Sequence, residues 1–71
     1  MEGTWIVEVD MPGTYLLVLP HKIETTSDGS RCTRFETYEE GEKAAKKYYK
    51  GRQRLSSPRI FQPDWLKRER R

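Results

Sequence analysis

Cysteine and histidine are almost missing from this sequence, and long apolar segments are missing altogether. The single cysteine, Cys32, excludes an internal disulfide and a cysteine-based zinc site, and it fits a reducing compartment. The longest apolar run, Tyr15–Leu19, is far shorter than the ~20 residues that cross a bilayer. No basic segment precedes an apolar stretch near Glu2, so we expect no signal peptide and a cytoplasmic location.

The residues that carry most enzyme chemistry are scarce and isolated. His21 has no identifiable nucleophile, orienting carboxylate or metal co-ligand around it in Pro20–Lys22. Cys32 lies in an expected strand, where a partly buried structural thiol is favoured over a nucleophile. The acidic residues show no HExxH or EF-hand spacing. We therefore predict a non-enzymatic protein without a metal, a cofactor or a small-molecule substrate.

Strand patterns dominate the first half of the chain. Thr4–Asp10 alternates between two faces, and Tyr15–Leu19 is a continuous apolar run typical of a central strand. A Pro-Gly pair between them predicts a type II turn. Arg31–Glu36 is the next expected strand, and Ile23–Thr26 extends an edge. After the helical region, Arg59–Gln62 is short enough to return as a last strand.

A capping box marks the start of the one expected helix. Thr37 and Glu40 have the T-x-x-E spacing, in which each side chain accepts a hydrogen bond from a free amide. Apolar and small residues then recur at helical spacing up to Gly51, which is a typical C-terminal stop. Gly41 lies on the apolar face, so we expect this helix to pack closely on a sheet.

These patterns predict an α+β protein in which a small antiparallel sheet of three to four strands packs on one α-helix, in the order β-β-β-α-(β). A chain this short buries only about 60% of its unfolded surface, which leaves room for one core. We assign residues 1–62 to a single domain and residues 63–71 to a basic, flexible C-terminal tail. Trp65 serves either as an anchor of that tail or as an interface hot spot.

Charge is unevenly divided along the chain. Residues 1–42 carry three basic and nine acidic side chains, whereas residues 43–71 carry eleven basic and two acidic ones. The formal net charge of +3 therefore hides a strongly dipolar molecule. Such an asymmetry indicates a surface that meets an acidic partner, either nucleic-acid phosphate or a protein.

The basic half supplies the candidate partner-binding residues. The helix lysines are partly explained by the helix dipole and by solvation, but the arginines that follow are not. Arginine pairs bidentately with phosphate and carboxylate groups. The acidic half would repel phosphate, which favours a protein partner over nucleic acid. The predicted site comprises Lys46, Lys47, Lys50, Arg52, Arg54, Arg59, Trp65, Lys67, Arg68, Arg70 and Arg71.

The order of these segments resembles that of small bacteriophage accessory proteins. The similarity rests on Trp5–Val9, on Gly13–Leu16 and on the strand-to-helix step Arg34–Lys47 (RFETYEEGEKAAKK). It implies a monomeric, non-catalytic protein of the host bacterial cytoplasm that regulates or inhibits a host protein complex, with RNA polymerase as the favoured target. Other phage proteins of this kind counter CRISPR defence, which is an alternative function.

A second resemblance is to the arm-type DNA-binding domains of phage integrases, which also have three strands and a helix. It implies a nucleic-acid-binding module that lays the same basic half on phosphates. The strands of those domains are basic, whereas Tyr15–Leu19 is apolar here.

Overall fold

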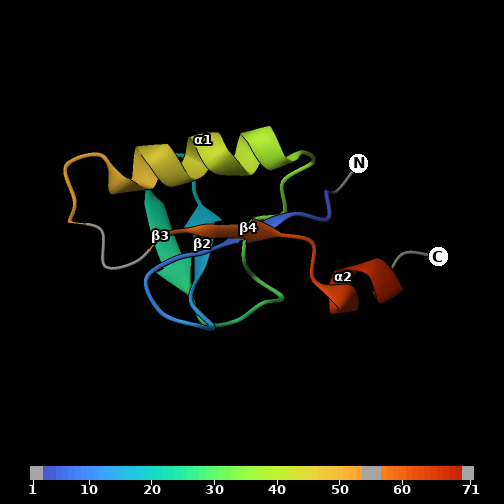
Figure 1. Cartoon of the computed structure of the whole chain (residues 1–71). Helices are drawn as coiled ribbons and strands as arrows, with labels where there is room; N and C mark the ends of the chain where they lie inside the picture. Colours follow the sequence, from blue (N-terminus) through green and yellow to red (C-terminus); the bar gives the residue numbers. More distant parts are fainter. Residues whose placement is uncertain (1–2, 54–56, 70–71) are drawn as a thin grey trace.

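A computed structural model describes residues 3–53 and 57–69 of the chain, the last three of them by their backbone alone. The described residues form one sheet and two helices (Figure 1). The elements are β1 (Ile6–Glu8), β2 (Tyr15–Val18), β3 (Ile23–Thr26), α1 (Tyr38–Tyr49), β4 (Arg59–Phe61) and α2 (Asp64–Glu69). This architecture confirms the predicted α+β class, with a small antiparallel sheet that packs on a helix.

The strands are ordered β3-β2-β1-β4, and each neighbouring pair is antiparallel. β2 is internal, as its continuous apolar run predicts. It pairs with β3 along its whole length but meets β1 only where Tyr15 lies opposite Glu8. Gly13, in the turn that joins β1 to β2, has a φ of 84°, the left-handed conformation that a type II turn requires.

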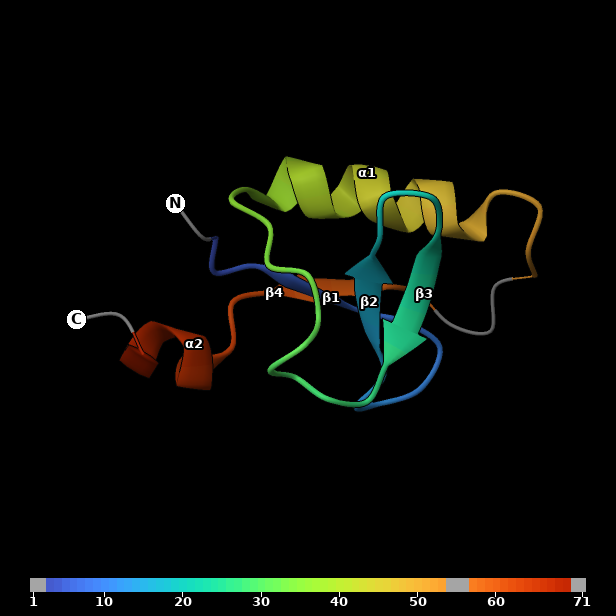
Figure 2. The same ribbon diagram turned by 180° about the vertical axis from the view of Figure 1, so that it is seen from behind.

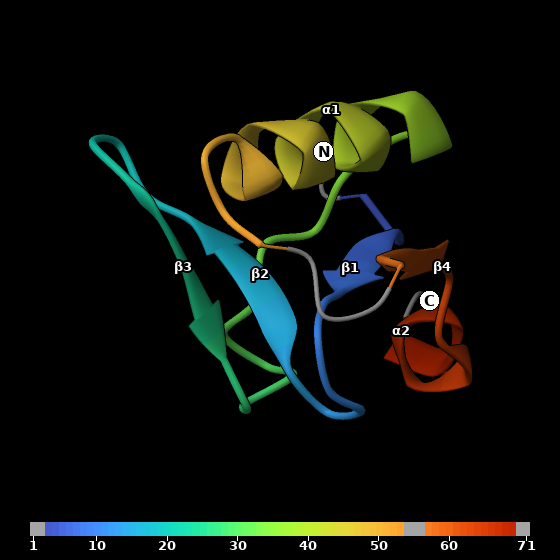
Figure 3. The same cartoon turned by 60° about the vertical axis from the view of Figure 1, so that its left-hand side comes forward.

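The prediction of a strand at Arg31–Glu36 is wrong, because β1 and β2 diverge beyond their single pair and this segment enters the gap (Figure 3). Thr33 donates its N–H to the Leu16 carbonyl of β2 at 3.1 Å. Two residues later, Phe35 exchanges two backbone hydrogen bonds with Trp5, which precedes β1. The segment therefore touches two strands in turn and follows neither. The third strand is Ile23–Thr26 instead.

The capping box of α1 forms with one change of partner. The Thr37 hydroxyl accepts a hydrogen bond from the Glu40 N–H at 3.1 Å, as predicted. The Glu40 carboxylate reaches back one residue further than expected and accepts from the Glu36 N–H at 3.2 Å. At the other end, Gly51 has a φ of 78°, so it can leave the helix in a left-handed conformation.

α1 packs chiefly on β1 and β4 because its contact face is made of small residues. Gly41, Ala45 and Tyr49 are buried and recur every four residues along the helix. A Cβ atom at position 41 would lie 3.0 Å from the Ile60 Cγ2 and 3.2 Å from the Val7 Cγ2. Glycine thus lets the helix backbone approach the sheet closely, as the sequence indicates.

A second helix covers the opposite face of β1 and β4 (Figures 1 and 3). Leu66 of α2 is only 2% exposed and packs with Ile6 and Cys32. Its N–H donates to the carbonyl of the buried Pro63, which starts the helical turn. The flexible tail predicted from Pro63 is therefore corrected to a short helix through Glu69, because Leu66 has an apolar surface to cover.

Candidate functional site

The β2–β3 half of the sheet is left open on the side of α1. Figure 3 shows α1 above β1 and β4 while the β2–β3 hairpin slants away from the helix. In Figure 2 the hairpin turn lies beside the C-terminal half of α1. Between them lies a groove of about 500 Å³, which we call the cationic groove. It is lined by residues 18–23, Phe35, Lys43, Ala44, Lys47, Tyr48, Lys50 and Arg52.

Positive side chains from two distant parts of the sequence converge on this groove. Lys43 and Lys47 lie one turn apart on α1, and Lys50, the C-cap residue of the helix, follows three residues later and also lines the groove. Lys22 approaches from the hairpin, and Arg52 follows the helix. No carboxylate lines the groove within the described residues.

These cations are poorly neutralised by the protein itself. Within residues 3–53 and 57–66, no carboxylate lies at ion-pair distance from any of the three groove lysines of α1. Lys22 is the exception, because its Nζ lies 2.6 Å from the Glu24 carboxylate. Like charges three and four residues apart on a helix repel one another. The groove is therefore a concentrated positive potential that favours an anionic ligand.

The wall of the groove opposite the lysines is aliphatic. Val18 and Ile23 are cross-strand partners at the end of the hairpin, and Val18 is 39% exposed. Leu19 and Pro20 of the turn continue this surface, and Ala44 lies across from it on α1. The groove thus offers apolar contact area beside its charges.

Arg52 is held in place by an aromatic ring. Its guanidinium carbon lies 4.5 Å from the centroid of the Tyr48 ring. Such a cation–π contact restrains the side chain and leaves its N–H donors available. The contact also occupies one face of an aromatic ring that lines the groove.

Of the eleven residues predicted as partner-binding, three lie together in the groove: Lys47, Lys50 and Arg52. Lys46 lies on the other side of α1, in a separate hollow beside Pro58 and Ile60. Arg59 and Trp65 lie farther away, on the face of the sheet opposite α1. Arg54, Arg70 and Arg71, and the side chains of Lys67 and Arg68, fall outside the described residues.

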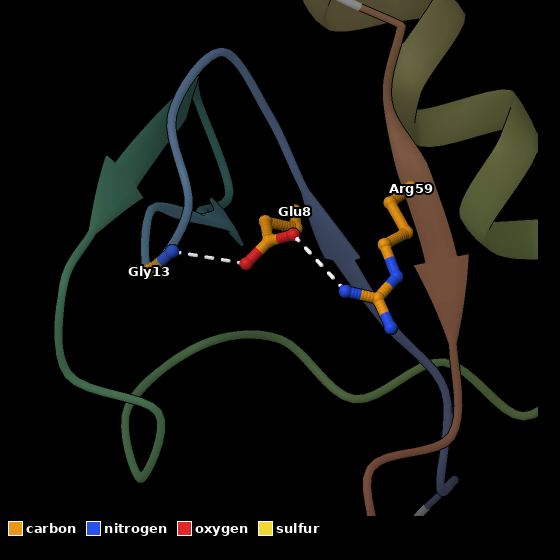
Figure 4. A network of polar contacts seen from close by, with 3 residues as sticks. All are labelled: Glu8, Gly13 and Arg59. Carbon is orange, nitrogen blue, oxygen red and sulfur yellow. Dashed lines mark hydrogen bonds and ion pairs between the residues drawn. The ribbon is translucent and has the colours of Figure 1, made fainter.

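Arg59 is engaged within the protein. Its Nη1 lies 3.7 Å from one oxygen of the Glu8 carboxylate, and the Gly13 N–H donates to the other oxygen at 2.9 Å (Figure 4). The guanidinium also lies 4.2 Å from the centre of the Phe61 ring. Glu8 is largely buried, so this arrangement links β1, its following turn and β4. Arg59 therefore makes contacts within the protein, although its side chain is 67% exposed.

Trp65 also has an internal contact. A Cβ atom on Gly29 would lie 3.0 Å from the Trp65 Cη2, so the ring packs directly over that turn. The side chain remains 38% exposed. In the turn itself, the hydroxyl and amide of Ser30 donate to the Asp28 carboxylate and lower its pKa. Trp65 thus helps to hold α2 on the body of the protein.

The two residues weighed for catalysis have different surroundings. Cys32 is 6% exposed, its Sγ lies 3.3 Å from the Gly29 carbonyl, and burial raises the pKa of its thiol. A buried neutral thiol is a poor nucleophile and a good packing group. His21 is exposed at the hairpin turn and lines the groove. The described residues contain no cluster of histidine, cysteine and acidic residues that could hold a metal.

The groove residues that the sequence does not predict are mainly those of the hairpin wall. In the sequence, Val18 and Ile23 belong to expected strands and Lys22 precedes one, so none of them is among the predicted partner-binding residues. Their alternation does place Val18 and Ile23 on one face of a hairpin, but nothing local indicates that α1 fails to cover them. Lys43 belongs to the basic half of the chain, but the predicted partner-binding residues begin at Lys46.

No protein-family model, curated protein or solved structure matches this chain. No helix in the described part of the chain has the length and apolar character needed to cross a membrane. What the fold and groove define is a small α+β protein with an open, positively charged groove.

Proposed function

We propose that this chain is a non-catalytic binding protein that attaches to an acidic surface of a host protein complex through the cationic groove. Bacterial RNA polymerase is the first candidate target, as for the small phage proteins that the sequence resembles, and the bacterial cytoplasm is the compartment. The observation that carries the proposal is the convergence of Lys43, Lys47, Lys50 and Arg52 on one groove that no carboxylate of the described residues lines.

The charge distribution on α1 supports this proposal. Glu39 and Glu40 lie in the first turn of the helix, whereas Lys46 and Lys47 lie in the last. These two acids thus lie one turn before Lys43 and about two turns before Lys47, and neither lines the groove. Complementary potentials of this kind raise association rates and exclude partners of the wrong sign.

The test compares two double variants of equal charge in a pull-down with purified RNA polymerase and with bacterial lysate. Lys43→Gln/Lys47→Gln removes cations from the groove. Its control carries Arg31→Gln and Lys46→Gln, which lie outside the groove. We expect the groove variant to lose at least about tenfold in recovered partner while the control stays close to wild type. Equal losses in both variants would mean that only net charge matters.

Nucleic acid is the second candidate partner, because the same cations suit phosphates. Nuclease treatment of the lysate separates the two functions. A protein partner should be recovered with and without nuclease, and its recovery should depend on the groove cations. Recovery that disappears after nuclease treatment would instead assign the groove to nucleic acid.

A further inference from the structure

We propose that the cationic groove recognises an acidic segment that also inserts an aliphatic side chain between the β2–β3 hairpin and α1. This inference rests on the proposed function and specifies the chemistry of the partner. It is carried by two different surfaces that meet in one groove. One is a row of cations on α1 that have no ion-pair partner among the described residues, and the other is an exposed aliphatic wall on the hairpin.

The aliphatic wall is larger than an anion alone would use. Val18 is 39% exposed on a strand whose other α1-side residue, Leu16, is completely buried. Ile23 pairs with Val18 across the hairpin, and both residues line the groove. Burying an aliphatic side chain there would remove apolar surface from water and so stabilise the complex. A groove of about 500 Å³ has the size of sites that enclose several side chains.

The cations face this wall from the helix. Lys43 and Lys47 are one turn apart, so they can pair with carboxylates on successive turns or alternate residues of a partner segment. Arg52, held on the Tyr48 ring, presents a pre-positioned guanidinium at the end of the row. A partner segment that alternates carboxylates with an aliphatic residue would therefore satisfy both surfaces at once.

The aromatic residues of the groove argue against single-stranded nucleic acid as its occupant. Stacking proteins present exposed aromatic faces to successive bases. Here Phe35 is 9% exposed, and one face of Tyr48 is covered by Arg52. The remaining apolar surface is aliphatic, which suits leucine or isoleucine better than a base. Charge complementarity and the aliphatic wall together favour an acidic, amphipathic protein segment.

The experiment uses the full chain and three fluorescein-labelled probes. One peptide combines glutamates with leucines, the second replaces every leucine by serine at the same net charge, and the third probe is an oligothymidylate. Fluorescence anisotropy gives the dissociation constant of each. We expect the leucine peptide to bind about tenfold or more tightly than the serine peptide and the oligonucleotide.

Two variants separate the wall from the cations. Val18→Ser should weaken the leucine peptide by roughly fivefold or more and leave the serine peptide unchanged, because only the leucine contacts the wall. Lys47→Gln should weaken both peptides, whereas the adjacent Lys46→Gln should weaken neither beyond a small effect of net charge. Circular dichroism checks that each variant is folded.

Each outcome decides the inference. Equal binding of the two peptides, or tighter binding of the oligonucleotide, would overturn it, as would an equal effect of Val18→Ser on both peptides.

The proposed function is judged separately by the pull-down. If the groove cations are needed to recover RNA polymerase but leucines do not improve peptide binding, the inference fails and the function stands. If the leucine peptide binds as expected but no polymerase is recovered, the inference stands and the proposed function fails.

Discussion

The two halves of the sheet differ in how their faces are covered. β1 is enclosed on both sides, by α1 through Val7 and by α2 through Ile6, and each of these residues is 0% exposed. The β2–β3 hairpin has no helix directly over its end, and Val18 there is 39% exposed. The same alternating pattern therefore produces a core in one half and an open groove in the other.

The difference follows from the side chains of α1. Gly41 and Ala45 allow the helix backbone to approach β1 and β4. On the side that faces the hairpin, the helix carries Lys43 and Lys47, whose ammonium groups need water or an anion. A helix with small residues on one side and lysines on the next cannot cover the whole sheet. The stability of the protein thus resides in the enclosed half, and the open half is available for binding.

Removing the packing of α2 on the enclosed half of the sheet should have the largest effect on stability. Leu66→Ala removes a side chain that is 2% exposed against Ile6 and Cys32. We expect the free energy of unfolding to fall by about 2–5 kcal/mol, as for other large-to-small core substitutions. Urea unfolding followed by tryptophan fluorescence measures it. The matched control, Val18→Ala in the open half, should cost about 1 kcal/mol or less. Similar costs at both positions would show that the two halves are equally packed.

Breaking the close approach of α1 should have a smaller effect. Gly41→Leu introduces a side chain where even a Cβ lies 3.0 Å from Ile60. We expect a loss of about 1–3 kcal/mol, the usual range for overpacking. Ala44→Leu, on the groove side of the same helix, has open space beside it and should change the unfolding free energy by less than about 1 kcal/mol. Thermal unfolding compares the two, and a larger loss from Ala44→Leu would contradict the comparison.

The smallest effect concerns Tyr49, which is buried at the end of the contact face of α1. Its hydroxyl donates to the Asp10 carboxylate at 2.9 Å, and burial with that hydrogen bond raises the pKa of Tyr49 to about 12. The folded state favours the protonated phenol, so its contribution is full below pH 10 and is lost as the pH rises to about 12. Tyr49→Phe should cost about 1 kcal/mol at neutral pH.

The alkaline behaviour tests this assignment independently. Ultraviolet absorbance should show a late tyrosine step near pH 12 in the wild type, and this late step should be missing in Tyr49→Phe. The variant should also lose less stability than the wild type between pH 10 and 12. Tyr38→Phe is the control, because Tyr38 is 44% exposed. A late step that survives in Tyr49→Phe would assign the raised pKa to another residue.

Local patterns predicted the elements that depend on neighbouring residues. The capping box at Thr37, the stop at Gly51 and the turn at Gly13 all appear in the structure, because each satisfies backbone groups within a few residues. The internal position of β2 and the close packing at Gly41 were also predicted correctly. In each case the residue type by itself limits what the backbone can do.

Elements that depend on distant contacts were missed. The segment Arg31–Glu36 alternates like a strand, but the divergence of β1 and β2 gives it two partners in place of one. The basic composition of the C-terminal end predicts a tail, but in the structure Leu66 packs against Ile6, which lies sixty residues earlier in the chain. Arg59 stays a predicted partner-binding residue, but the sequence does not indicate that its guanidinium lies 3.7 Å from the Glu8 carboxylate.

The sequence alone determined the α+β class, the limits of α1 and the dipolar division of charge, since composition and short-range spacing set these features. Only the tertiary structure decided which cations act together. Lys22 joins Lys43 and Lys47 because the hairpin turn lies beside the helix, while Arg59 leaves the group because it lies on the opposite face. The physical reason is that a groove requires an uncovered surface, and coverage is a property of the packed chain as a whole.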